Sequence, residues 1–91
     1  MVLQSREVTI MNELGLHAKA SAAFVRLANQ FGSGVTVEAN GKRVNGKSIM
    51  GLLMLAASKN SRILITARGD DAVEAVDSLS QLVMSKFGDE E

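Results

Sequence analysis

The stretch VTVEANGKRVN, residues 35–45, has an Asn-Gly pair between two short segments, residues 35–39 and 42–45. Apolar and polar residues alternate over residues 35–39, which is the pattern of a strand with one buried face. Asn40-Gly41 is the preferred dipeptide for a tight type I′ hairpin turn, so residues 42–45 are expected to form the returning strand. The stretch therefore predicts an antiparallel hairpin near the middle of the chain.

Upstream of the hairpin, the sequence predicts one strand and one helix. Arg6, Val8 and Ile10 alternate with Glu7 and Thr9, so residues 6–10 are expected to form a first strand with one buried face. A loop containing Gly15 follows, and from Ala18 onward the apolar residues recur at helical spacing. Gly32 and Gly34 then predict the end of this helix, because glycine commonly ends helices.

Downstream of the hairpin, the sequence predicts a helix, a strand and a last helix. The apolar run over residues 49–57 is expected to be helical, and residues 62–68 alternate as a strand. A helix then begins after Gly69. Asp71 and Glu74 have the spacing of a capping box at its start.

The predicted order of elements is therefore β-α-β-β-α-β-α. Strands connected through helices, together with one tight hairpin, predict an α+β fold in which helices cover one face of a sheet. The 91 residues are expected to form one small domain, residues 1–91, and 46% of them are hydrophobic, which is enough to build a core.

Composition argues against several classes of function. Ten basic and ten acidic residues balance, and there are three Phe but no Trp or Tyr, so nucleic-acid binding is not expected. With no cysteine and one histidine, neither a disulfide nor a metal site is expected, and no complete nucleotide-binding motif points to a cofactor. No signal peptide or apolar run of membrane-spanning length is seen, so we expect a cytoplasmic protein without membrane insertion.

The single histidine, His17, lies in the stretch NELGLHAKASAAF, residues 12–24. Gly15 allows a sharp turn, and helical sequence begins directly after His17, which places the histidine at or just before the helix N-terminus. The helix dipole at such a position disfavours an imidazolium and favours an arriving phosphate, and Lys19 adds positive charge. One interpretation is a nucleophile that accepts a phosphoryl group; the other is a histidine that merely starts a helix. No nucleophile elbow accompanies it, so a self-contained enzyme is not expected.

The apolar run over residues 49–57 has two apolar sides. The side assigned to the core comprises Ile49, Leu52, Leu55 and Ala56. The other side comprises Met50, Leu53, Met54 and Ala57. Because a helix on a sheet buries only part of its circumference, we expect the methionine side to be partly exposed and to mark a surface for partners. The alternative is that the methionines fill gaps in the core.

Ser48 directly precedes this helix. Serine is a preferred N-cap, and its position favours that interpretation. A hydroxyl at a helix N-terminus is also a place where a phosphate group is tolerated, so a modification site is the alternative.

Two segments carry a resemblance to a known family. GLHAKA at residues 15–20, and NGKRVNGKSIMGLLMLAASKNSRILITARGDDAVEAV at residues 40–76, resemble HPr, the histidine-containing phosphocarrier family of the bacterial phosphotransferase system. The resemblance covers nearly the whole chain. It implies an open-faced β-sandwich with four antiparallel strands and three helices on one face.

The resemblance also implies roles for particular residues. His17 would accept a phosphoryl group at its Nδ1 from the phosphohistidine of enzyme I and pass it to an EIIA-type acceptor, as a stoichiometric carrier rather than an enzyme. Lys19 takes the position of the family's active-site arginine, and Ser48 matches the serine that HPr kinase/phosphorylase modifies. The implied partner-binding residues are Ile49, Met50, Leu53 and Met54. The protein is expected to be a monomer.

The chain departs from the family pattern after the histidine. The usual run His-Ala-Arg-Pro-Ala is replaced here by His17-Ala18-Lys19-Ala20-Ser21. Lysine keeps the charge but lacks the two-pronged fork of arginine, and Ala20 lacks the preorganisation of proline. Two hypotheses follow: a phosphocarrier, or a regulatory module that acts by protein binding and is switched at Ser48. A small-molecule sensor of similar design is ranked below both.

Overall fold

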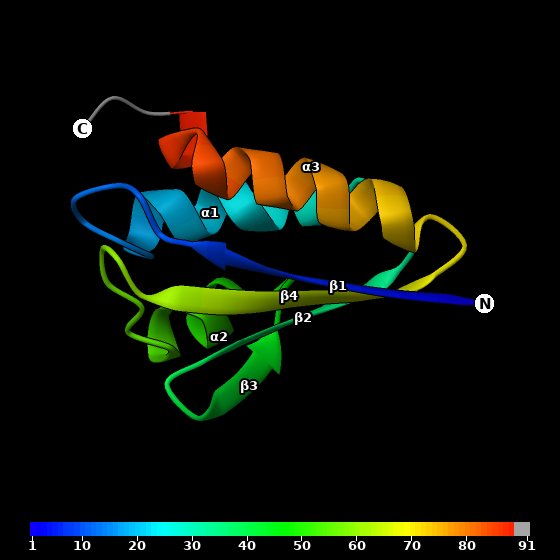
Figure 1. Ribbon diagram of the computed structural model, residues 1–91, viewed down its shortest axis with the longest axis horizontal. Helices are drawn as coiled ribbons and strands as arrows, with labels where there is room; N and C mark the ends of the chain where they lie inside the picture. The colour runs from blue at the N-terminus through cyan, green and yellow to red at the C-terminus, as the bar shows by residue number, and fades with distance from the viewer. Residues whose placement is uncertain (89–91) are drawn as a thin grey trace.

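The computed structural model describes residues 1–88 of the chain (Figure 1). The elements are β1 (Val2–Thr9), α1 (Ala18–Ala28), β2 (Gly34–Ala39), β3 (Lys42–Asn45), α2 (Ile49–Met54), β4 (Arg62–Gly69), α3 (Ala72–Met84) and a short 3₁₀ helix, η1 (Lys86–Gly88). The predicted order β-α-β-β-α-β-α is confirmed, with η1 as an addition at its end.

The four strands form one antiparallel sheet in the order β1-β4-β2-β3. The hairpin predicted at Asn40-Gly41 joins β2 to β3, and both turn residues have the positive φ angles, 54° and 77°, that a type I′ turn requires. Helices α1 and α3 lie beside each other over the sheet, and α2 lies near β3 (Figure 1). The fold is the expected α+β open-faced sandwich, with the three helices on one face.

The core lies between the sheet and the helices. Alternate residues of β2 and β4, such as Val37 and Ile65, point inward and are fully buried, as the period-two pattern predicts. Phe24 of α1, Leu52 of α2 and Leu79 of α3 meet them from the helical layer. Burial of these apolar side chains is the main favourable contribution to folding.

Two helices end earlier than the sequence suggests. Helix α1 ends at Ala28 rather than at Gly32 and Gly34, because the amides of Gln30 and Phe31 turn back to Leu27 and Ala28 in tighter i→i−3 bonds. Gly32 then takes part in a tertiary contact instead of a helix cap.

Helix α2 ends at Met54, where residues 49–57 were expected to be helical, because Ala56 has a φ of 51° that breaks the helix. The break changes which side chains reach the core. Ile49 and Ala56, both assigned to the core side, are exposed, whereas Ala57, assigned to the opposite side, is buried. Leu52 and Leu55 are buried as expected.

The capping box predicted at Asp71 and Glu74 is wrong. Asp71 occupies the N-cap position of α3, but its side chain makes no cap hydrogen bond. Its carboxylate instead accepts hydrogen bonds from the amides of Gly32 and Ser33, each at 2.9 Å, and from the Ser33 hydroxyl. These bonds, led by that of Ser33, hold the pKa of the Asp71 carboxyl below its ordinary value. Asp71 therefore ties the start of α3 to the α1–β2 loop.

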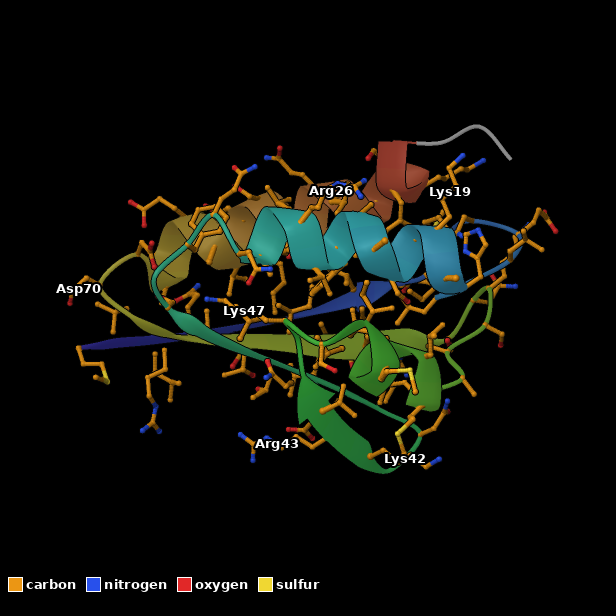
Figure 2. The ribbon with its side chains drawn as sticks, turned by 180° about the vertical axis from the view of Figure 1, so that it is seen from behind. Lys19, Arg26, Lys42, Arg43, Lys47 and Asp70 are labelled. Atoms are coloured by element: carbon orange, nitrogen blue, oxygen red, sulfur yellow. The ribbon has the colours of Figure 1, made fainter. Side chains whose placement is uncertain are left out.

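We expect the Asp71→Asn variant to be less stable than the wild type at neutral pH, since an amide replaces the ionised acceptor of three hydrogen bonds. Because the folded-state pKa is lowered, the carboxylate contributes stability above its unfolded pKa, and this contribution is lost as the pH falls through the folded value. The two proteins should therefore converge at acid pH. Thermal unfolding across this range is the measurement. The matched control is Asp70→Asn, which makes the same change at an exposed neighbouring carboxylate (Figure 2) and should leave the stability at neutral pH close to that of the wild type.

Candidate functional site

His17 is the N-cap residue of α1, as the sequence predicts. Its backbone is extended, with φ −80° and ψ −177°, and its carbonyl accepts the amide of Ser21 at 2.8 Å, the first hydrogen bond of the helix. The first turn of α1 contains no acidic residue, so nothing there offsets the partial positive charge of the helix N-terminus. This end of α1 is therefore electrostatically suited to an anion held by His17.

The loop before His17 is fixed by a close approach of two backbones. Gly15 has a φ of 65°, and a Cβ atom at this position would overlap the carbonyl oxygen of Ala57 and lie 2.9 Å from the Cα of Ser58. The adjacent amide of Leu16 donates to the Ala57 carbonyl at 2.9 Å. Only glycine fits here, and the contact places His17 next to the segment that follows α2.

The imidazole of His17 is half-buried and lies against the backbone of the loop. Its Nδ1 lies 3.1 Å from the carbonyl oxygen of Gly15, which is hydrogen-bonding distance for a protonated Nδ1. The same oxygen accepts the backbone amide of His17 at 2.9 Å and the side-chain Nδ2 of Asn12 at 2.9 Å. The imidazole thus rests on a carbonyl that already has two other donors.

Lys19 lies in the first turn of α1, two residues after His17 and at the same end of the molecule (Figure 2). A small surface hollow of about 230 Å³ runs from Lys19 along the helix to Arg26, with Phe87 and Gly88 of η1 on its far wall. Arg26 adds a second cation to this helix face. The sequence could have shown it, because residues seven apart fall on one face of a helix, but the prediction considered only Lys19.

Ser48 caps helix α2. Its Oγ accepts the backbone amide of Gly51 at 3.0 Å, so the cap interpretation is confirmed. The preceding residue, Lys47, extends its Nζ to the carbonyl of Phe31 at 2.8 Å and ties the start of α2 to the segment after α1. The start of α2 is therefore held by the Ser48 cap and by the hydrogen bond from Lys47 to Phe31.

The predicted exposure of the methionine side of α2 is confirmed. Met50 and Met54 are 70% and 62% exposed, and Leu53 is partly exposed. Ile49 joins them on the surface, although the helical pattern assigned it to the core. We call this surface the α2 patch; it comprises Ile49, Met50, Leu53 and Met54.

Helices α1 and α2 lie side by side on one face of the molecule (Figure 2). The loop that carries His17 also contacts the backbone just beyond α2, through Gly15 and Ala57. The structure therefore brings together the three features singled out from the sequence: the histidine, the lysine and the apolar helix. Ser48 lies at the start of α2, whereas the Gly15 contact lies beyond its end.

Comparison with known proteins identifies the family. A family model described as the PTS HPr component phosphorylation site matches residues 4–85. The phosphocarrier protein HPr of Cupriavidus necator is 46% identical over 86 residues, which cover 94% of this chain and 97% of that protein. The chain belongs to the HPr family.

Solved structures of the family match in fold. An HPr from Thermoanaerobacter tengcongensis superimposes with a TM-score of 0.91 at 42% identity, covering 97% of this chain and 99% of the other. Crh, a catabolite-repression protein of Bacillus subtilis, matches with a TM-score of 0.74 at 42% identity, covering 94% and 97%, and its structure is described as a dimer with a swapped domain. That the present chain is a monomer stays a prediction.

Within residues 1–88, no group of three or more His, Cys, Asp or Glu side chains is placed to hold a metal ion. Across the same residues, no helix has the length and apolar character needed to span a bilayer.

We expect Gly15→Ala to lower the free energy of unfolding by roughly 2 kcal/mol or more, because a side chain at this φ is strained and its Cβ overlaps the Ala57 carbonyl. Chemical denaturation measures the change. The control is Gly34→Ala at the start of β2, where a Cβ meets open space and stability should change by no more than about 0.5 kcal/mol. Equal stability of the two variants would contradict the assigned role of the Gly15 contact.

Proposed function

We propose that this HPr-family chain is a phosphocarrier in which His17 accepts a phosphoryl group from phosphorylated enzyme I and passes it to an EIIA-type acceptor. The observation that carries the proposal is the position of His17 as the N-cap of α1, with Lys19 in the first turn and no acidic residue there. Such a carrier is consumed and regenerated once per transfer and is not itself an enzyme.

The transfer requires a lone pair on one ring nitrogen of His17. By resemblance to the family, Nδ1 attacks the phosphorus of the donor phosphohistidine; a new P–N bond forms as the donor's P–N bond breaks, and the donor's ring nitrogen recovers its electron pair. The proton of the neutral His17 ring must then reside on Nε2. Since Nδ1 rests against the Gly15 carbonyl, the ring must leave this contact before it attacks.

Lys19 and the helix N-terminus are proposed to stabilise the phosphoryl group after transfer. Both act on the same charge, since Lys19 lies in the first turn of the helix that His17 caps. Lysine acts as a point charge without the paired geometry of an arginine fork, so its effect depends on distance more than on orientation. The proposal predicts weaker positioning of the phosphate than an Arg-Pro member of the family provides.

The α2 patch is proposed to bind enzyme I and the acceptor. Its four apolar side chains are exposed on an element that lies beside α1, so a partner that covers the patch also reaches the start of α1. Methionine side chains adapt to surfaces of different shape, which suits a carrier with successive partners. Docking and transfer would then use one continuous face.

A second candidate function is regulation through Ser48. The departure at Lys19-Ala20 and the likeness to Crh favour a role in which protein binding is switched by phosphorylation of Ser48 by an HPr kinase/phosphorylase. A phosphate on Ser48 would place negative charge next to Ile49 and Met50 of the α2 patch. Burying that charge against an apolar partner surface is unfavourable.

For the phosphocarrier function, incubation with enzyme I and phosphoenolpyruvate should add one acid-labile phosphoryl group to the intact protein. Because His17 is the only histidine, His17→Ala should abolish the addition completely. Intact-mass measurement before and after acid treatment gives the result. The control Ser48→Ala should be phosphorylated like the wild type. An unmodified wild type, or a modified His17→Ala variant, would overturn the proposal.

For the regulatory function, Ser48→Asp should weaken binding of enzyme I or the acceptor by about tenfold, equivalent to about 1.4 kcal/mol, because a charge must be desolvated beside the α2 patch. Ser48→Asn is the matched control, because asparagine has the same shape as aspartate, is a good N-cap residue and carries no charge. Titration calorimetry compares the three proteins. If the Asp and Asn variants bind alike, a charge-based switch at Ser48 is excluded.

A further inference from the structure

Asn12 is a buried polar residue with no assigned role. It lies in the loop between β1 and α1, is 1% exposed, and donates from Nδ2 to the carbonyl oxygen of Gly15 at 2.9 Å. We infer that Asn12 is a positioning residue that makes Nδ1 of His17 available for phosphoryl transfer, acting through the Gly15 carbonyl. The inference rests on the proposed function, in which Nδ1 is the attacking atom.

The Gly15 carbonyl is shared by three donors. Asn12 Nδ2 and the His17 amide each lie 2.9 Å from its oxygen, and His17 Nδ1 lies 3.1 Å away. A carbonyl oxygen has two lone pairs, so the three donors compete and each additional bond is weaker. The imidazole makes the longest of the three contacts.

The competition has a direct effect on the imidazole. In neutral histidine, one ring nitrogen carries the proton and the other carries the lone pair. A strong bond to Gly15 would keep the proton on Nδ1 and remove the lone pair that attacks phosphorus. Because Asn12 occupies part of the acceptor, it weakens this hold and favours the tautomer with the proton on Nε2.

Asn12 also prepares the state that follows transfer. A phosphorylated Nδ1 has no proton to donate, so the ring must leave the Gly15 oxygen. Asn12 Nδ2 and the His17 amide remain as donors, and both lone pairs of the buried carbonyl stay satisfied. Without Asn12, departure of the ring would leave that oxygen with a single donor, which is unfavourable in a buried loop.

The other end of the Asn12 amide points to function rather than packing. Its Oδ1 has no hydrogen-bond partner among the described residues, although it is buried. An unpaired buried oxygen destabilises the folded state, and an apolar residue of the same shape would avoid this. An apolar residue that only filled space would not carry this unfavourable free energy. The hydrogen bond from Asn12 Nδ2 to the Gly15 carbonyl therefore explains why an asparagine is found here.

The test compares Asn12→Leu, which keeps the shape, with Asn12→Ala, which removes the side chain. Both lose the donor. The matched control is Ser21→Ala, which removes a buried donor to the neighbouring Leu16 carbonyl and leaves the Gly15 oxygen untouched. Thermal unfolding and amide NMR spectra establish that each variant is folded.

The main readout is the ¹⁵N NMR spectrum of the imidazole, which distinguishes the two neutral tautomers and contains signals of one histidine only. Both Asn12 variants should shift the tautomer ratio toward protonated Nδ1 by roughly fivefold, the factor that corresponds to one hydrogen bond. The maximal rate of transfer from phosphorylated enzyme I should fall by a similar factor, while KM stays unchanged, because Asn12 is buried and does not face the partner. Ser21→Ala should change neither quantity.

Two results would overturn the role of Asn12: an unchanged tautomer ratio in both Asn12 variants, or an equal shift in Ser21→Ala. The NMR measurement needs no phosphoryl donor, so it stands apart from the proposed function. A wild-type protein that takes up no phosphate overturns the phosphocarrier proposal instead, whatever the tautomer ratio shows.

Discussion

The close approach of Gly15 to the backbone of Ala57 and Ser58 is the contact on which the site depends. Strands β1 and β4 pair in antiparallel register, so the segment leaving β1 and the segment entering β4 lie at the same end of the sheet. The amide of Leu16 and the carbonyl of Ala57 join them at 2.9 Å. One segment leads into α1 and the other comes from α2. This contact therefore fixes the position of the histidine relative to the apolar helix.

The opposite end of α1 is held by side-chain hydrogen bonds instead of a close backbone approach. There the Asp71 carboxylate binds the amides of the α1–β2 loop, and Lys47 reaches the Phe31 carbonyl. Helix α1 is thus tied at its start by backbone contacts and beyond its end by side chains from α3 and the segment before α2. With both ends fixed, the exposed α2 patch and the start of α1 keep a constant relation. The proposed docking surface is thus supported by contacts at both ends of α1, and pre-organisation of this kind lowers the entropic cost of binding.

The sequence predicted the features that are encoded by residues close together along the chain. Alternation over residues 35–39 and the Asn40-Gly41 pair predicted the hairpin, and Gly15 before His17 predicted a histidine at the start of a helix. It could not predict Asp71, because a capping box is defined by spacing along the chain, whereas the actual partners lie 38 and 39 residues away. Asn12 was missed for the same reason: loop residues have no periodicity, and burial of a polar side chain is visible only in the fold. The exposure of Ile49 follows from a helix that ends early, which the apolar run did not reveal.

Lys19-Ala20 stands where the family resemblance implies Arg-Pro, and this difference bears on how the proposed phosphoryl group would be held. A carrier must hold its phosphoryl group firmly enough to accept it and loosely enough to release it, so excessive stabilisation of either state slows transfer. An arginine fork would hold the phosphate in one orientation, whereas lysine and the helix dipole supply charge with little directional constraint. The orientation of the imidazole then depends on the loop itself, through the Gly15 carbonyl. In this chain, control of the proposed reaction thus lies less in a side-chain clamp on the phosphate than in the backbone contact that positions the histidine.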